Sequence, residues 1–428
     1  MGGSTGDLER RYKAVLSPVL GRYTWLQLDR GEGSYLITRD GRRVLDLTCG
    51  IAVTPIGHAH PKVVRAVSEQ AARLLHISAG VAAYEPNVAL AEALVSVTPP
   101  GLDMVFFQNS GAEAVEAAVK LARKVTGRQS IVAFRGGFHG RTTGAAALTS
   151  SKSGYRKGYG ALLPEVHIAP YPYPLACRIQ PAHDDAACTR HALDELDAML
   201  EHEVPPEHVA AFLIEPILGE GGYWPAPAPF LRELRALATR IGALMISDEV
   251  QTGMGRSGAW LGITRAGVVP DIVTLAKALG GGMPLGAVLA PRALHEQWGT
   301  GTHGSTFGGN PVSCAAGLAT FGVIRDERLV ERADELGAIM LEELAPLRRA
   351  ASVRDVRATG AMGAVEFDGK PAATAARLGA LDRDVLLITC GAHDQVVRFI
   401  PPLNIGEDDL RRGLRAFVEA ARGAAVAV

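Results

Sequence analysis

Short apolar runs alternate along the chain with longer stretches in which apolar residues recur every three or four positions. Runs of four to six residues bounded by turn residues are typical of buried strands, and the longer periodic stretches are typical of amphipathic helices. Strands that alternate with helices favour a mainly parallel α/β sheet covered on both faces. Strands are predicted at 104–107, 130–134, 209–214, 243–247, 272–275 and 285–289, and the clearest helices at 110–124 and 230–240.

The pattern changes in two later parts of the chain. Residues 171–206 are rich in Pro, His and Cys, which predicts that this segment contains a long excursion. From Pro311 to about Leu347 the sequence is helical, and short strands after it predict a second, smaller α/β unit. A length of 428 residues agrees with two units, because one core rarely serves more than about 250–300 residues. The strands of the smaller unit are expected near 353–356, 361–366 and 396–400.

Composition excludes several classes of protein. The 44 basic and 45 acidic side chains nearly balance, unlike those of a strongly basic nucleic-acid-binding protein, and 47% hydrophobic content is too high for a disordered chain. Five scattered cysteines without a C-x-x-C pair favour a reducing compartment over a disulfide scaffold or a zinc site. With neither a signal segment at the start nor an apolar run of about 20 residues, a cytoplasmic location is expected.

Two apolar regions isolate charged side chains. Lys277 is the only charged residue in 272–291, and burial would lower the pKa of its amine until it could form a Schiff base with a carbonyl. Asp248 and Glu249 are the only charges in 241–255 and follow a predicted strand, where α/β sheets bind ligands. Neighbouring strand residues face opposite ways, so one carboxylate can enter a site and pair with a pyridine nitrogen. The structural alternatives are a lysine at a strand edge and two carboxylates in a polar loop.

A third candidate lies between a predicted strand and helix, where the sequence reads Gln-Asn-Ser-Gly-Ala-Glu. Ser110 and Glu113 fit a capping box at the start of the helix. The small residues Gly111 and Ala112 would let a phosphate approach the backbone N–H groups and the positive helix end. The alternative is a capped helix without a ligand.

A fourth candidate, Gly-Gly-Phe-His-Gly-Arg at 136–141, follows another predicted strand. Its glycines allow close approach of the backbone, and Phe138 could stack on a flat ring. The alternative is a tight turn with an aromatic plug. His58 and His60 have no acidic or cysteine partner nearby in the sequence, so no metal site is expected.

Together these places supply a Schiff-base lysine, a carboxylate for a pyridine nitrogen, a phosphate cradle and a stacking aromatic ring, which pyridoxal 5'-phosphate requires. In this combination the sequence resembles the class III (ω-) aminotransferases of the fold-type I pyridoxal-phosphate enzymes, from about Gly31 to Arg411. Among them it is most similar to the 4-aminobutyrate aminotransferases, chiefly through AYEP and SGAEAVE. The motifs, in family order, are GIAVTPIGHAHP, AYEP, NSGAEAVEAAVKLAR, FHGRT, EPILGEGG, SDEVQTGMGRSG, TLAKALGGGMPLGAV, THGSTFGGNP and VVRFIPPL.

The resemblance implies cofactor contacts for the residues that match these motifs. Lys277 is expected to form the Schiff base and move the proton. Asp248 is expected to pair with the pyridine nitrogen, and Gln251 to bond the 3'-oxygen of the ring. The other cofactor contacts are expected from Ser110, Gly111, Ala112, Phe138 and His139, and from Thr306 of the neighbouring subunit.

The resemblance also implies how the substrates are held. Arg141 is expected to bind the distal carboxylate and Arg398 the α-carboxylate, since arginine suits bidentate recognition. Glu220 is expected to neutralise Arg398 when the donor has no carboxylate there, and to move away for 2-oxoglutarate. Ile51 matches an apolar pocket residue of the family. Leu218 stands where relatives often have Gln, which predicts a changed polar contact near the pocket.

The implied protein is a fold-type I transferase with a large domain at 61–315, a small domain at 316–428 and residues 1–60 packed on the small one. The implied assembly is a homodimer with shared active sites, or a tetramer of such dimers, without nucleic acid, membrane or metal partners. The implied reaction moves an amino group from 4-aminobutyrate or a related ω-amine to 2-oxoglutarate, giving an aldehyde and glutamate. The alternatives are an acetylornithine- or ornithine-type aminotransferase, an amino-acid racemase or epimerase, and a non-catalytic binding protein.

Overall fold

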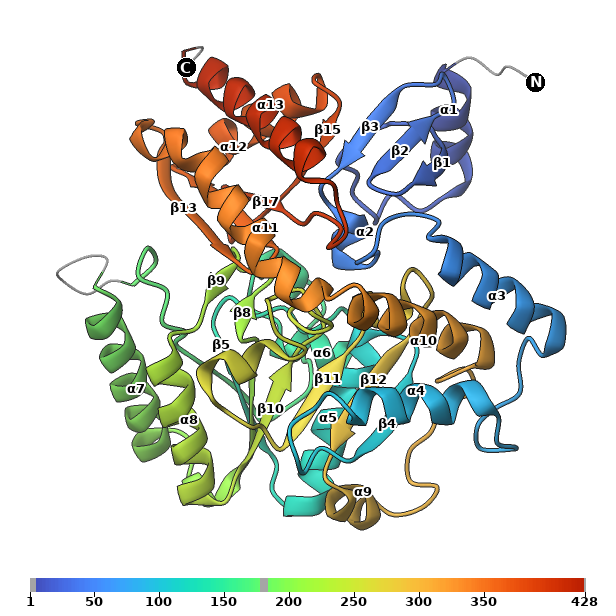
Figure 1. Ribbon diagram of the computed structural model, residues 1–428. Helices are drawn as coiled ribbons and strands as arrows, with labels where there is room; N and C mark the ends of the chain where they lie inside the picture. Colours follow the sequence, from blue (N-terminus) through green and yellow to red (C-terminus); the bar gives the residue numbers. More distant parts are fainter. Residues whose placement is uncertain (1–4, 178–183, 427–428) are drawn as a thin grey trace.

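A large, mainly parallel sheet lies at the centre of the computed structural model, which describes residues 5–177 and 184–426 (Figure 1). Within these residues its strands run in the order β4-β12-β11-β10-β7-β5-β6. Neighbours from β6 to β11 are parallel, whereas β12 runs antiparallel to both β11 and β4. The predicted α/β class is confirmed. The strands are β4 (Met104–Gln108), β5 (Ser130–Phe134), β6 (Val166–Ala169), β7 (Val209–Ile214), β10 (Leu244–Asp248), β11 (Ile272–Leu275) and β12 (Gly286–Ala290).

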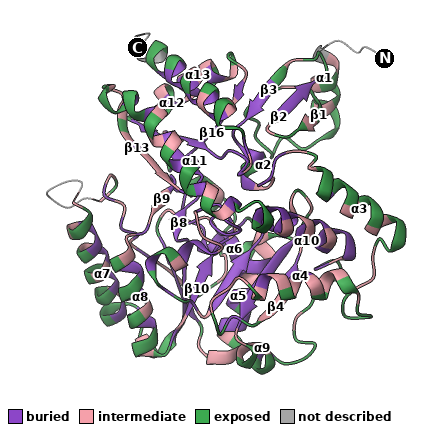
Figure 2. Ribbon diagram, viewed as in Figure 1, coloured by how far each residue is buried: buried purple, intermediate pink, exposed green. Residues whose placement is uncertain are grey.

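Helices cover both faces of this sheet, so its central strands are apolar on both sides. In β5, Ile131 and Ala133 pack with the apolar face of α5, while Val132 and Phe134 pack with α8 on the opposite face. Figure 2 shows the buried strands and the helices that expose one face. The helices of this part are α3 (Pro61–Arg73), α4 (Glu85–Val95), α5 (Gly111–Thr126), α6 (Thr143–Leu148), α7 (Asp185–His202), α8 (Ala228–Ile241) and α9 (Arg292–Trp298), with the 3₁₀ helices η1 (Ser153–Tyr155), η2 (Pro206–His208), η3 (Gly262–Ala266) and η4 (Lys277–Gly280).

The segment 171–206, which was expected to contain a long excursion, includes a helix that was not predicted, because α7 occupies half of it. Asp184 begins the helix by accepting hydrogen bonds from the N–H groups of Ala186 and Ala187. Apolar residues of α7 at helical spacing are buried. Residues 178–183 of the segment lie outside the described residues.

The last part of the chain forms a second α/β unit, as predicted, with strand order β13-β14-β17-β16. Strand β15 does not join it but pairs in parallel with β3 from the start of the chain. The expected division at residues 60 and 315 stays a prediction, and α10 runs without interruption across residue 315. The elements are α1 (Thr5–Val15), β1 (Leu28–Glu32), β2 (Tyr35–Thr38), β3 (Arg43–Asp46), α2 (Cys49–Ala52), β8 (Ile217–Leu218), β9 (Trp224–Pro225), α10 (Pro311–Asp326), α11 (Leu329–Leu344), η5 (Ala345–Arg349), β13 (Val353–Thr359), β14 (Met362–Phe367), α12 (Lys370–Leu381), β15 (Val385–Leu386), β16 (Ile388–Cys390), β17 (Val396–Phe399) and α13 (Glu407–Val426).

Two further predictions concern compartment and membrane contact. All five cysteines are free thiols, and four of them are buried. Over residues 5–177 and 184–426, no helix is both long and apolar enough to cross a membrane. The cytoplasmic location stays a prediction.

Candidate active site

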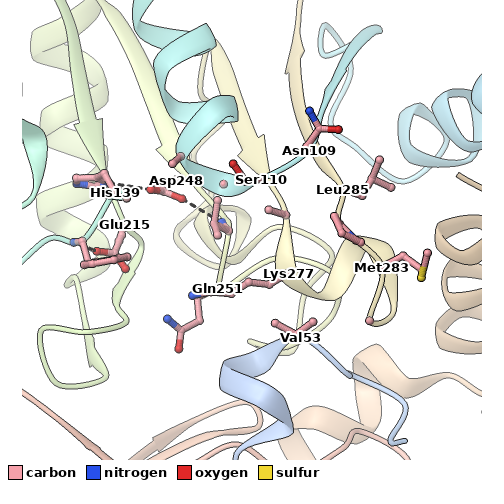
Figure 3. Close-up of a pocket in the computed structure, with 18 residues that line it drawn as sticks. Val53, Asn109, Ser110, His139, Glu215, Asp248, Gln251, Lys277, Met283 and Leu285 are labelled. Atoms are coloured by element: carbon pink, nitrogen blue, oxygen red, sulfur yellow. Dashed lines mark hydrogen bonds and ion pairs between the residues drawn. The ribbon is translucent and has the colours of Figure 1, made fainter. Parts of the chain in front are cut away.

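A cavity of about 390 Å³ opens where the strands of the large sheet end (Figure 3). The carboxyl ends of β4, β5, β7, β10 and β11 and the amino end of the antiparallel β12 all meet at this edge, which is where open α/β sheets bind ligands. The cavity is lined by Val53, Asn109, Ser110, Gly111, Ala112, Phe138, His139, Gly140, Glu215, Asp248, Val250, Gln251, Ala276, Lys277, Gly282, Met283, Pro284 and Leu285.

Lys277 follows β11 and extends into this cavity beside Gln251 (Figure 3). Its backbone φ is +44°, a conformation that residues other than glycine rarely adopt. Burial lowers the pKa of its amine, against the opposing effect of the Glu220 charge. A buried amine with a lowered pKa is suited to attack a carbonyl carbon.

Asp248 ends β10 and forms a buried pair with His139. The Nδ1 of His139 lies 2.7 Å from Asp248 Oδ2, and Asp248 Oδ1 accepts hydrogen bonds from Val250 N–H at 3.1 Å and from the Thr274 hydroxyl at 3.2 Å. Burial opposes protonation of the imidazole, but the hydrogen bond and charge of Asp248 outweigh it and raise the His139 pKa. The Asp248 carboxylate can therefore stabilise a protonated His139 imidazole at the cavity wall through a charge-assisted hydrogen bond.

Glu249 points away from the cavity, as expected for the next residue after a strand. Its carboxylate accepts hydrogen bonds from the backbone N–H groups of Gly262 and Ile263, each at 2.8 Å, and from the hydroxyls of Ser247 and Thr252. This carboxylate fastens η3 to β10 and contacts no cavity atom.

The start of α5 presents backbone N–H groups to the cavity. Ser110 caps the helix by accepting a hydrogen bond from Glu113 N–H at 3.2 Å. The Glu113 carboxylate accepts a hydrogen bond from the N–H of Asn109 at 2.7 Å. Asn109 lies one residue before the position whose N–H a standard capping box uses. A Cβ on Gly111 would come within 2.9 Å of the Val250 side chain, so glycine allows the tight approach of these segments. The unpaired N–H groups of the first turn can bind a phosphate.

Two residues that were not predicted from the sequence lie in the lining of the cavity or contact it. Glu215 follows β7, and its carboxylate accepts hydrogen bonds from Phe138 N–H at 2.7 Å and from Gly219 N–H at 2.8 Å. The Tyr223 hydroxyl donates to Gln251 Oε1 at 2.5 Å. Glu215 could have been found, because like Asp248 it is a charge directly after an apolar run, whereas an uncharged tyrosine gives no such signal.

Comparison with known proteins identifies the family to which this site belongs. Residues 18–421 match the family described as aminotransferase class-III. The chain is a class III aminotransferase. It is 40% identical to the acetylornithine aminotransferase of Methanopyrus kandleri, over 92% of this chain and 93% of that protein. It is 36% identical to the 4-aminobutyrate aminotransferase of Escherichia coli, over 96% and 97%. The structure of an ω-transaminase from Pseudomonas jessenii in complex with PMP has a TM-score of 0.92 and 25% identity, covering 98% of both chains.

Class III aminotransferases use pyridoxal 5'-phosphate, and the cavity of this aminotransferase fits that cofactor. Its lining presents an amine at Lys277, a carboxylate at Asp248 and backbone N–H groups at the start of α5. These are the functional groups that the cofactor requires. In residues 5–177 and 184–426 no group of three His, Cys, Asp or Glu side chains could hold a metal ion, and His58 instead contacts Asp46 Oδ2 at 2.8 Å.

A buried ion pair of the aminotransferase lies outside the lining of the cavity. Arg398 Nη1 of β17 is 2.6 Å from Glu220 Oε1, with side-chain exposures of 1% and 13%. Burial opposes the charge on Glu220, but the charges of Arg398, Lys277 and Lys152 and the Arg398 hydrogen bond together outweigh it and lower the carboxyl pKa. The charges of both residues act on the Lys277 amine, which ties this pair to the cavity.

Arg141 is exposed, and its guanidinium lies 4.0 Å from the ring centroid of Tyr155. Tyr155 in turn packs edge-on against Phe138, with ring centroids 5.5 Å apart. The structure thus places this arginine against Tyr155 rather than in the lining of the cavity. Tyr155 is a further residue that sequence patterns did not indicate.

Three further residues that the sequence singled out, Ile51, Thr306 and Leu218, also lie outside the lining of the cavity. Ile51 is 40% exposed and belongs to α2, close in sequence to the lining residue Val53. Thr306 is exposed. Leu218 is buried, and a Cβ added to Gly136 would lie 3.0 Å from its side chain. Leu218 therefore makes an apolar packing contact with the turn at Gly136.

Proposed function

We propose that this aminotransferase takes its amino group from 4-aminobutyrate or a related ω-amine and passes it to 2-oxoglutarate, giving an aldehyde and glutamate. The buried Glu220–Arg398 pair carries the proposal. A donor without an α-carboxylate would leave Arg398 as an uncompensated buried charge, which is costly. Glu220 already supplies the missing negative charge, so such a donor can bind without that cost.

The same pair explains how one site accepts the second substrate. The α-carboxylate of 2-oxoglutarate can replace Glu220 on Arg398 and make the bidentate contact that arginine favours. Glu220 keeps 13% of its side chain exposed and so has a path toward water. The distal carboxylate would bind Arg141, whose guanidinium is exposed beside Tyr155.

The proposed cofactor contacts follow from the cavity wall. When bound, pyridoxal 5'-phosphate withdraws electrons from the carbon that carries the amine. Lys277 would bond to the cofactor's aldehyde carbon, and after the amine of the substrate has displaced it, its free amine would move the proton between the substrate carbon and that carbon. Asp248, supported by His139, would keep the pyridine nitrogen protonated. The other proposed contacts are Gln251 on the ring oxygen, Phe138 on the ring face, and Ser110 with the N–H groups of Gly111 and Ala112 on the phosphate.

Replacing Glu220 by Ser tests the exchange. Removing the carboxylate should raise kcat/KM for glutamate relative to 4-aminobutyrate about tenfold or more. The α-carboxylate of glutamate would no longer compete with Glu220 for Arg398, whereas bound 4-aminobutyrate would leave Arg398 unpaired. Steady-state assays with both donors measure this ratio. Glu201→Ser, at an exposed position on α7, is the control. An unchanged donor profile in the Glu220 variant would contradict the proposal.

An acetylornithine-type donor is the second candidate. The 40% identity to the Methanopyrus kandleri enzyme favours it. A donor screen with 2-oxoglutarate and pyruvate as acceptors, covering 4-aminobutyrate, ornithine, acetylornithine, lysine and β-alanine, separates the two. Consumption of the donor in proportion to 2-oxoglutarate distinguishes either reaction from racemisation.

We further propose a homodimer in which Thr306 completes the phosphate site of the partner chain. Thr306 is exposed and absent from the lining of its own cavity. Lys277→Ala and Thr306→Asp chains should each be inactive alone, the second because its carboxylate repels the phosphate. Mixed dimers made by co-expression with two tags should regain activity, because one of their two sites has an intact Lys277 and an intact Thr306. Mixed dimers that stay inactive would contradict the shared site.

A further inference from the structure

Glu215 is a buried carboxylate of the cavity wall to which the proposed function assigns no role. Only 4% of the residue is exposed, and it follows directly on the last residue of β7. Its two oxygens are used by two different segments, since Oε1 accepts from Phe138 N–H at 2.7 Å and Oε2 from Gly219 N–H at 2.8 Å. The side chain therefore fastens two backbone segments that are about 80 residues apart in sequence.

Both segments carry residues of the proposed site. The first is the turn after β5, which holds Phe138 and His139 against the cavity. The second ends at Gly219, directly before Glu220. It is also tightly packed, because a Cβ on Gly219 would lie 2.2 Å from the amide of Gln251 and 3.1 Å from Glu215 Oε2. A shift of Glu215 would thus displace the backbone from which Glu220 projects.

The charge of Glu215 also reaches the reactive groups. It acts on His139 and on the amine of Lys277. Burial raises the pKa of Glu215 to about 7, against the effects of the His139 charge and of the two N–H bonds. Protonation would turn one acceptor oxygen into a donor that faces an N–H group, so both hydrogen bonds need the ionised form.

We propose that Glu215 is a positioning residue for transamination, whose carboxylate holds the backbone before Glu220 at a fixed place relative to the turn that carries Phe138 and His139. Part of this proposal rests on the proposed exchange of Glu220 on Arg398. The other part, the effect of Glu215 on the cofactor site, does not depend on the donor. Holding Gly219 in place limits the exchange to the Glu220 side chain and keeps the ring site unchanged while either substrate is bound.

Glu215→Gln tests the proposal, because glutamine has nearly the same shape but accepts only one of the two N–H bonds and carries no charge. We expect kcat/KM for 2-oxoglutarate to fall about tenfold or more, mainly through KM. We also expect the pH midpoint of the bound cofactor's visible absorbance to fall by about one unit, since a negative charge near Lys277 is lost. Glu215→Asp keeps the charge but shortens the side chain. Its absorbance midpoint should therefore stay closer to that of the wild type than its KM for 2-oxoglutarate does.

Glu249→Gln is the matched control, since that carboxylate is equally buried and also accepts two backbone N–H bonds, but outside the cavity. It should lower thermal stability without moving KM or the absorbance midpoint. If Glu215→Gln behaves like Glu249→Gln, Glu215 is structural and the proposal is overturned. The outcome is separable from the proposed function. An unchanged donor profile in Glu220→Ser would remove the exchange, whereas the absorbance midpoint of the Glu215 variants would still report on the cofactor site.

Discussion

Replacing Lys277 by Ala is expected to lower kcat/KM of transamination by about 10⁴-fold, the upper end of what one positioned acid–base group contributes. The side chain is buried in the cavity, and burial has already lowered the pKa of its amine. No other lysine lines the cavity among the described residues, so no neighbour can take over the proton transfer. Single-turnover assays of each half-reaction measure the loss directly.

The control for this variant is Lys124→Ala, because Lys124 lies exposed on α5 and its removal should leave the rate unchanged. Borohydride reduction of the wild-type protein loaded with cofactor should label Lys277 and no other residue, and the alanine variant should stay unlabelled. Small amines added to the alanine variant should restore part of the rate. A label on another lysine would refute the assigned role.

Asp248→Asn is expected to lower kcat/KM by about 10²–10³-fold, because the neutral amide cannot stabilise a protonated pyridine nitrogen by charge. The substitution keeps the shape of the side chain and an acceptor for the Val250 N–H and the Thr274 hydroxyl. It also removes the charge that raises the pKa of His139. The loss should therefore appear in the chemical step and in the cofactor's absorbance more than in folding.

The adjacent residue provides the comparison. Glu249→Gln disturbs a carboxylate that accepts from Gly262 and Ile263 N–H and contacts no cavity atom. Leaving a buried donor unpaired there should cost about 1–3 kcal/mol of unfolding free energy, with little change in the rate per folded site. Thermal melts and active-site titration separate the two effects. Equal losses of rate in both variants would show that Asp248 acts through folding alone.

The sequence predicted the large sheet well because its strands are buried on both faces and therefore lack polar residues. Because the segments around them also lack polar residues, Lys277 and Asp248 stand out in the sequence as isolated charges. The pattern of apolar runs did not predict β6, because its residues are only partly buried along most of the strand and include His167. The sequence pattern also failed to predict α7, because proline, histidine and cysteine concealed the helical spacing that follows Asp184.

The pairing of residues far apart in the chain could not be read from local patterns. Glu220 and Arg398 are 178 positions apart, and their ion pair forms only because β17 packs beside the turn that follows β8. Tyr155, whose ring contacts the Arg141 guanidinium, and Tyr223, whose hydroxyl donates to Gln251, have no neighbours in the sequence that mark them as site residues. Their roles depend on which side chains the fold brings to them. Family motifs could name Glu220 and Arg398, but not these neighbours.

The pairing of β3 with β15 has a consequence for how the protein is made. Strand partners Leu45 and Val385 are 340 residues apart, so at about 5–20 residues per second a ribosome needs roughly 20–70 s between them. Leu47, just after β3, also bonds to the backbone of Leu386 and Ile400, and Val53 nearby closes the cavity. A nascent chain can form the large sheet early, but this wall of the cavity has to wait until β15 has been made. We therefore expect full cofactor binding only after β15 has left the ribosome.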